Sequence, residues 1–183
     1  MEEQEIEKKP FKDYVLKHGV ILGLIHIILF LLIYLIDLNL VVSFSYMFMV
    51  LAINFGFCIY AGIQYRKENG PYLLFGKAFK LVFLILAING LLNLILGIVI
   101  ISVDENYSAN MEEAQVSFSI GIAEWFGAPE EALDEAREKA YEEVKGKFTV
   151  LQTIKGYFIG LIFYAIGAAI VGLVVRKKEP EDF

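Results

Sequence analysis

Four long apolar runs dominate the pattern of hydrophobic and polar positions along the chain. They cover residues 19–36, 41–63, 81–101 and 157–175. Each run has about 18 to 23 residues, enough to cross about 30 Å of hydrocarbon at about 1.5 Å per helical residue. A buried helix of a soluble protein seldom stays apolar on all sides for that length. The pattern therefore predicts four membrane-spanning helices.

The composition indicates that lipid is the solvent of this chain. Its 183 residues are 57% hydrophobic and its mean hydropathy is +0.59, which is too apolar for an ordinary soluble domain. The four prolines, Pro10, Pro71, Pro129 and Pro180, all fall outside the runs, so no span is expected to be kinked by proline. Cys58 is the only cysteine, and one cysteine builds neither a disulfide framework nor a thiolate metal site within a chain.

Cationic side chains flank the runs on one side of the predicted membrane. Lys8, Lys9, Lys12 and Lys17 precede the first run, Arg66, Lys67, Lys77 and Lys80 join the second to the third, and Arg176, Lys177 and Lys178 follow the fourth. Positive residues favour the cytoplasmic side, so we expect a multi-pass protein of the cell inner (plasma) membrane with both termini in the cytoplasm. The four cations between the second and third runs are also expected to anchor the chain to anionic lipid.

The chain divides accordingly into five segments. They are a cytoplasmic N-terminal segment (1–17), the first three spans (18–101), an acidic extracytoplasmic loop (102–152), the fourth span (153–175) and a cytoplasmic tail (176–183). The expected fold is an all-α membrane protein, a four-transmembrane-helix bundle with an amphipathic helical extracytoplasmic insertion between spans 3 and 4.

The acidic loop is predicted to be largely helical. Pro129 suits the first position of a helix, and apolar residues then recur at three- or four-residue steps, with Gly146 able to break the helix. Residues 111–126 fit both a strand and a helical stripe, and we favour a helix because a lone strand would have no partner. Carrying Trp125 and Phe126, that helix could lie on the outer membrane surface or on the other helices. The loop either packs on its own bundle or serves as a docking or lid element.

Four polar residues interrupt the spans, although no Asp, Glu, Lys or Arg lies in the middle of any run. The missing charges weigh against a proton pump, a voltage sensor or an ion-coupled carrier. Near mid-depth lie His26, Asn54 and Asn89, with Asn93 one turn outward, so the four side chains can meet. They are either interhelical glue, at about 1 kcal/mol per hydrogen bond, or the lining of a small polar cavity for a head group or solute, with His26 titrating near neutral pH.

Two glycine pairs predict close helix packing. Gly19 and Gly23 form a G-x-x-x-G motif in the first span, and Gly156 and Gly160 form another at the start of the fourth. Such small-residue surfaces let helices approach closely, within one chain or between chains. The first pair lies near the cytoplasmic end and the second near the outer end, so the two motifs are not expected to face each other.

Three short motifs resemble a known family. They are Gly62-Ile63-Gln64-Tyr65-Arg66 closing the second run, Phe75-Gly76-Lys77-Ala78-Phe79-Lys80 opening the third, and Val103-Asp104-Glu105-Asn106-Tyr107 leaving it. Over nearly the whole chain, the order of features resembles an uncharacterised bacterial inner-membrane family, common among Bacteroidetes and known as domain of unknown function 4199. At the exit of the third run that family would have Asp-Pro where this chain has Asp-Glu. The resemblance implies a fold and a cell location, and it brings no activity or site residues.

Two functional hypotheses follow from these features. Because no nucleophile, acid–base pair, metal cluster or phosphate-binding glycine loop stands out near a membrane face, we expect no enzyme, no cofactor and no metal site. The first hypothesis is a non-enzymatic integral membrane protein that assembles with itself or with another envelope component through its small-residue faces and residues 104–150. The second is a binder or carrier of a small solute or lipid at the mid-membrane polar residues. Beyond the lipid bilayer, the expected partner is a second copy or a membrane protein, and not nucleic acid.

Overall fold

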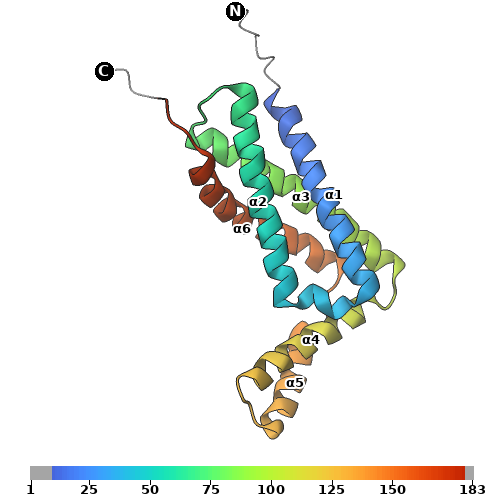
Figure 1. Cartoon of the computed structure of the whole chain (residues 1–183). Coiled ribbons are helices and arrows are strands. Elements are labelled where there is room, and N and C mark those ends of the chain that lie inside the picture. The colour runs from blue at the N-terminus through green and yellow to red at the C-terminus, as the bar shows by residue number, and fades with distance from the viewer. Residues whose placement is uncertain (1–9, 180–183) are drawn as a thin grey trace, which may run out of the picture.

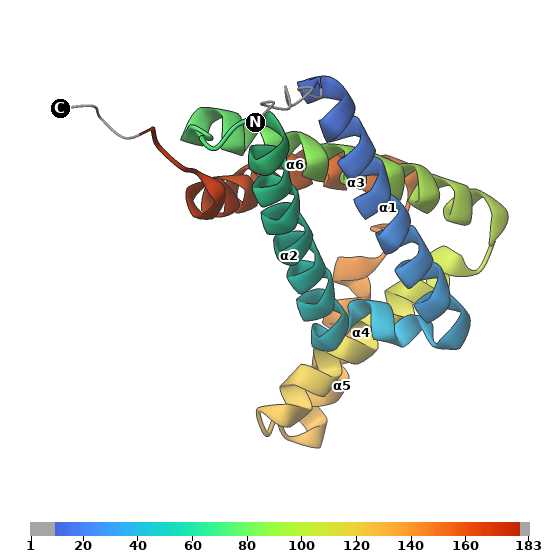
Figure 2. The ribbon, with the colours of Figure 1, turned by 45° about the horizontal axis from the view of Figure 1, so that its top comes forward.

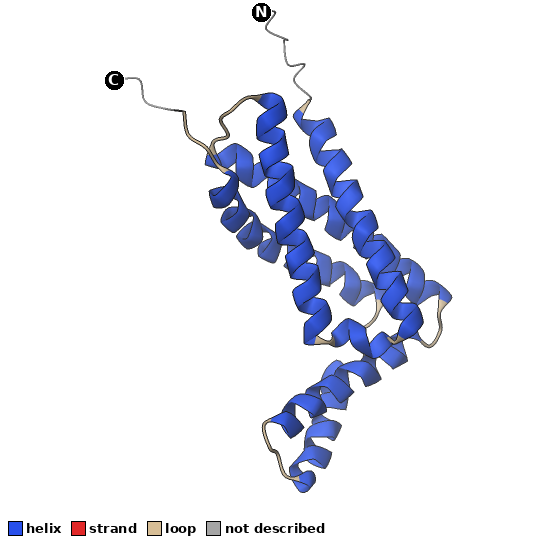
Figure 3. Ribbon diagram, viewed as in Figure 1, coloured by secondary structure: helices blue, strands red, loops and turns tan. Residues whose placement is uncertain are grey.

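The computed structural model describes residues 10–179. Residues 1–9, which include Lys8 and Lys9 of the predicted cytoplasmic segment, and residues 180–183 of the predicted tail lie outside the described residues. The elements are α1 (Phe11–Ile36), the 3₁₀ helix η1 (Leu38–Val42), α2 (Phe44–Asn69), α3 (Phe75–Val103), α4 (Tyr107–Trp125), α5 (Glu130–Val144) and α6 (Val150–Val175). The described chain is helical throughout (Figure 3), apart from its turns and one antiparallel bridge between Leu73 and Lys177.

Helices α1, α2, α3 and α6 contain the four apolar runs. They have 26, 26, 29 and 26 residues, and each is long and apolar enough to cross a membrane. In the most apolar window of each, only 17–28% of the residues are buried inside the protein. Most of their apolar surface therefore points outward, where lipid can cover it. The predicted all-α fold with four spans is confirmed.

Helix α3 is the centre of the bundle. It packs most extensively against α6 and next against α1, while α2 packs less closely and chiefly on α6. Figure 1 and Figure 2 both show α1 and α2 in one layer, with α3 and α6 crossing behind them. One hydrophobic cluster contains Leu22 of α1, Ala61 of α2, Ile85 of α3 and Val171 of α6. All four spans thus contribute to the same core.

The second span begins later than predicted. The apolar run from residue 41 reads as continuous, yet residues 38–42 form η1 and only then does α2 start. The Asp37 carboxylate accepts a hydrogen bond from the Asn39 backbone N–H at the start of η1, and Ser43 Oγ accepts one from the Tyr46 N–H at the start of α2. These two polar caps divide an apolar stretch, and a hydropathy pattern does not detect such caps.

Between the third and fourth spans, α4 and α5 form a helical hairpin that projects from one end of the bundle (Figure 1). Val116 and Ile120 of α4 are buried against Val144 of α5. Residues 111–126 lie almost entirely in α4, so the prediction of a helix rather than a strand is confirmed. Helix α5 supplies the apolar partner that makes the helical stripe of α4 stable.

The ends of α5 lie close to their predicted positions. The helix begins at Glu130, and Pro129 is the capping residue before it rather than its first helical residue. The helix ends at Val144, and Gly146 has φ 73°, a left-handed backbone conformation that favours glycine. The predicted break before the fourth span is therefore confirmed.

Candidate functional site

The four polar residues of the spans lie together where α1, α2 and α3 meet. His26 Nδ1 is 2.9 Å from Asn89 Oδ1, and Asn89 Nδ2 donates to Asn54 Oδ1 over 3.4 Å. Asn93 Nδ2 donates to the backbone oxygen and to Oδ1 of Asn89, at 2.8 and 2.9 Å. His26 and Asn89 are buried. We call these four residues the polar cluster, and its contacts join three of the four spans.

Asn89 is the hub of the polar cluster, and its contacts determine which ring nitrogen of His26 carries the proton. Because Asn89 Nδ2 donates to Asn54, its Oδ1 is an acceptor, so the proton in the bond to His26 lies on Nδ1. His26 Nε2 is then an acceptor, and among the described residues it is buried without a hydrogen-bond partner. A crevice of about 20 Å³ lies beside Asn54, but its lining is apolar and does not include His26.

The first glycine pair packs inside the bundle, between α1 and α3. A Cβ atom added at Gly19 would lie 2.7 Å from Ile88 Cβ, and one at Gly23 would lie 2.5 Å from Leu92 Cδ1. Distances that short are not tolerated between carbon atoms, so the two helices approach this closely only because glycine has no side chain.

The second glycine pair makes no contact with another described helix. Nothing lies within 4 Å of a Cβ built at Gly156, and the only atom near Gly160 belongs to Tyr164 of the same helix, at 3.9 Å. A side chain at either position would therefore meet no other described helix, and Gly156 is exposed while Gly160 is half-buried.

Two further glycine contacts escaped the sequence analysis. A Cβ at Gly62 of α2 would lie 2.8 Å from Val175, and one at Gly90 of α3 would lie 2.7 Å from the Tyr164 ring. Neither glycine has a second glycine four positions away. The G-x-x-x-G spacing therefore did not reveal these contacts. Each contact lets α6 approach a neighbouring helix closely, α2 at Gly62 and α3 at Gly90.

The predicted lipid anchors gather at the end of the bundle where α1 begins and α6 ends (Figure 1). Two of them also have partners within the protein. Arg66 Nη1 donates to the backbone oxygen of Val175 over 3.1 Å, which satisfies a carbonyl at the end of α6. Lys77 Nζ lies 5.2 Å from the centre of the Tyr65 ring, within the range of a cation–π interaction.

The other two anchors, Lys67 and Lys80, are exposed. Lys67 lines an open pocket of about 400 Å³ together with Arg66 and Lys177. The tail is held there because the backbones of Leu73 and Lys177 exchange two hydrogen bonds of 2.9 Å. The result is a positive edge at one end of the bundle.

The hairpin is fastened to the opposite end by side chains. The Tyr34 hydroxyl of α1 donates to the Asp104 carboxylate, and this hydrogen bond holds the pKa of Asp104 below its ordinary value. Ser108 Oγ donates to the backbone oxygen of Phe148 over 2.6 Å. Burial raises the pKa of the neighbouring Tyr107 to about 12, so its hydroxyl stays neutral at physiological pH.

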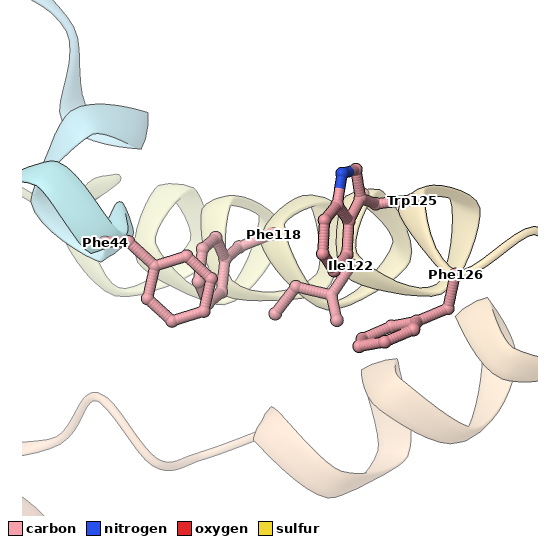
Figure 4. Close-up of a pocket in the computed structure, with 6 residues that line it drawn as sticks. Phe44, Phe118, Ile122, Trp125 and Phe126 are labelled. Carbon is pink, nitrogen blue, oxygen red and sulfur yellow. The ribbon is translucent and has the colours of Figure 1, made fainter.

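One side of α4 carries a large apolar groove (Figure 4). Its volume is about 550 Å³, and it is lined by Phe44, Phe118, Gly121, Ile122, Trp125 and Phe126. We call this surface the α4 groove. Trp125 and Phe126 are 81% and 76% exposed, which is unusual for such large apolar side chains. These two could be recognised from the sequence, but Phe44 of α2 joins them only in three dimensions.

Among residues 10–179, no group of three or more His, Cys, Asp or Glu side chains is arranged to hold a metal ion. Cys58 is a buried free thiol. What the described side chains offer instead is hydrogen bonding in the polar cluster, positive charge at one end, and apolar contact in the α4 groove.

The long apolar spans, with most of their surface turned outward, define a four-span helical membrane protein. The chain belongs to the family described as protein of unknown function, DUF4199, whose model matches residues 17–177. The match extends from the first turns of α1 to the Leu73–Lys177 bridge, and it confirms the resemblance seen in the sequence. Neither a search of curated proteins nor a search of solved structures found a match.

Proposed function

We propose that the protein is a non-enzymatic component of the cell inner membrane that assembles with a second copy of itself or with another envelope protein. The observation that carries this proposal is the open face at Gly156 and Gly160, where an added Cβ would meet no other helix. Phe163, one turn further along α6, is 66% exposed. A small-residue face beside a large exposed side chain is the kind of surface on which a second membrane helix packs.

The orientation of this component follows from its charges. Arg66, Lys67 and Lys177 lie at one end of the bundle, and we place that end in the cytoplasm because cations favour that side. The hairpin then lies outside the cytoplasm. Its helix α5 is acidic and largely exposed, with an i, i+4 ion pair of 2.6 Å between Glu135 and Lys139. We propose that this face receives a partner that carries positive charge.

Substitutions in α6 test the assembly. The purified full chain, in lipid nanodiscs or mild detergent, should give an assembled species by native mass measurement, or should retain a partner after affinity purification from its own membranes. Gly156→Leu combined with Gly160→Leu should remove that species. Gly56→Leu is the matched control. A Cβ built at Gly56 also has no atom within 4 Å, but Gly56 is on α2 and not on the proposed contact face of α6. A wild-type chain that is monomeric and without a partner, or an assembly insensitive to the α6 changes, contradicts the proposal.

A second candidate function is binding of a small solute or lipid head group at the polar cluster. The specific observation in its favour is His26 Nε2, a buried acceptor without a partner among the described residues, which a ligand donor could satisfy. Leucine in place of His26, Asn54 and Asn89 separates the two roles of the cluster. Intact folding and assembly with loss of a bound molecule supports a site, whereas loss of folding supports interhelical glue.

A further inference from the structure

The α4 groove continues the lipid-facing surface of α2. Phe44, Phe48 and Leu51 lie on one face of α2 at helical spacing and are 52%, 62% and 43% exposed, so lipid covers this stripe if α2 spans the membrane. The Phe44 ring meets the Phe118 ring of α4 edge to face, with 5.0 Å between the ring centres. An apolar surface therefore passes without interruption from a membrane span onto the hairpin.

The apolar stripe extends along one face of α4 away from that contact. Phe118, Ile122 and Trp125 follow at four- and three-residue steps, and Phe126 comes directly after the helix. Figure 4 shows their side chains in a row that begins at Phe44. The stripe contains no charged residue, and the face of α4 that bears Val116 is buried against α5 instead. In the second half of α4, one face thus packs on α5, whereas the opposite face is only half-buried at Phe118 and Ile122 and is exposed at Trp125.

The direction of α4 suits a membrane surface. Figure 1 and Figure 2 both show α4 passing beneath the start of α2 and then running obliquely outward with the hairpin, at an angle to the spans. A helix that runs at an angle to the spans at the end of a bundle, with one aromatic and apolar face, can be seated in the membrane interface. Trp is also the side chain that most favours the boundary between hydrocarbon and water.

We propose that the α4 groove is seated in the lipid leaflet at the hairpin end of the membrane. Phe118 and Ile122 contact the upper acyl chains, and Trp125 and Phe126 lie at the level of the phospholipid head groups. A second copy of the chain fits this surface less well than lipid does. The groove offers only six lining residues, against about 20–30 residues a side in a stable protein interface, and any protein there would also have to displace lipid from Phe48.

The native chain carries its own reporter for this proposal, because Trp125 is its only tryptophan. The purified full chain is reconstituted in vesicles of phosphatidylcholine and phosphatidylglycerol. In parallel samples the phosphatidylcholine carries bromine near the top of its acyl chains, carries bromine near their ends, or is unlabelled. Trp125 emission should shift to shorter wavelength than that of a water-exposed indole and should resist quenching by aqueous acrylamide. Bromine near the top of the chains should quench it more strongly than bromine near their ends.

A matched control moves the reporter to the other helix of the hairpin. Trp125→Phe combined with Tyr141→Trp places tryptophan on α5, where Tyr141 is 47% exposed, and its emission should be open to acrylamide and insensitive to brominated lipid. In a second variant, Phe126→Asp changes a residue beyond the end of α4 and should weaken the quenching of Trp125 by brominated lipid without loss of helical circular dichroism.

Three results would overturn the proposal. The first is a Trp125 that is fully open to acrylamide and unaffected by brominated lipid. The second is a Trp125 that is protected from acrylamide, is insensitive to brominated lipid, and becomes open to acrylamide when the protein is diluted in more lipid. That combination would show that a second copy of the chain, and not lipid, covers the groove. The third is equal bromine quenching of tryptophan at positions 125 and 141, which would place the whole hairpin in lipid.

Discussion

Asn89 holds more of the polar cluster together than its three neighbours do. Its side chain contacts His26, Asn54 and Asn93, whereas Asn54 is joined by one bond of 3.4 Å. Counting residues along each span was enough to predict that the four side chains could meet, because helix rise fixes depth. Rotation of each helix about its own axis depends on packing, so the sequence could not reveal that Asn89 is the hub.

Replacement of Asn89 should therefore destabilise the protein more than replacement of Asn54. Asn89→Leu leaves His26 Nδ1 buried without an acceptor, and we expect a loss of about 1–3 kcal/mol. Asn54→Leu removes one long bond and should cost about 0.5–1 kcal/mol. Unfolding in mixed micelles, followed by circular dichroism, measures both variants under the same conditions. Equal losses for the two would contradict the assignment of Asn89 as the hub.

The glycines of α1 lead to a second prediction at this scale. Gly19→Ala puts a methyl group against Ile88 Cβ, which moves only if its helix moves, whereas Gly23→Ala meets the flexible end of Leu92. We expect Gly19→Ala to destabilise the bundle by about 1–3 kcal/mol and Gly23→Ala by less. Gly56→Ala has open space and should be neutral or stabilising, since alanine is the better helix former. The same unfolding assay ranks the three, and a Gly19→Ala variant as stable as Gly56→Ala would show that α1 and α3 can separate without cost.

At the scale of elements, the spans could be predicted from hydropathy, while the pieces between them depended on local or tertiary contacts. Residues 111–126 matched both helical and strand spacing, and the apolar face of α5 supplied the partner that a helix needs. The division of the second run into η1 and α2 depends on Asp37 and Ser43 as caps. The join between Phe44 and Phe118 links residues far apart in the sequence, so no local pattern could predict it.

The attachment of the hairpin should weaken in acid. The pKa of Asp104 is lower in the folded protein than its ordinary value, so its hydrogen bond with Tyr34 stabilises the fold fully above about pH 4, the ordinary pKa of aspartate. This contribution is lost as the pH falls through the lowered pKa. Urea titrations followed by Trp125 emission should show an earlier transition at pH 3 than at pH 7.

Asp104→Asn is the control for that pH dependence. Its neutral amide accepts a weaker hydrogen bond from Tyr34 than a carboxylate does and does not titrate. The difference between the pH 3 and pH 7 transitions should therefore be smaller in Asp104→Asn than in the wild type. If the two differences are the same, other carboxyl groups account for the acid sensitivity and the Asp104 bond does not.

At the scale of the whole molecule, the charges separate along the bundle axis. Cations such as Arg66 and Lys67 lie at the end where α6 finishes, and the acidic hairpin lies at the other end. This separation could be predicted from the sequence because each charged segment lies next to a span of recognisable length. The looser packing of α2 against the other spans could not be predicted from the sequence, because it depends on the shapes of all four spans together.

The orientation can be measured with single cysteines. Native Cys58 is buried and should react little, so it can stay in place. Glu138→Cys on α5 should be labelled in intact cells by a maleimide that does not cross membranes, and Lys178→Cys should be labelled only after the cells are permeabilised. The reverse pattern would invert the topology, and labelling of both positions in intact cells would require an even number of crossings between them.

The central place of α3 has a consequence for how the protein is made. Its largest partner, α6, leaves the ribosome after it, and α4 and α5 are synthesised between them. At about 5–20 residues per second, this interval lasts a few seconds. During that time α3 is inserted with only α1 and α2 beside it, and the surface around Gly90 is turned toward lipid. The hairpin, whose helices pack on each other, can fold during this interval, before α6 packs on α3.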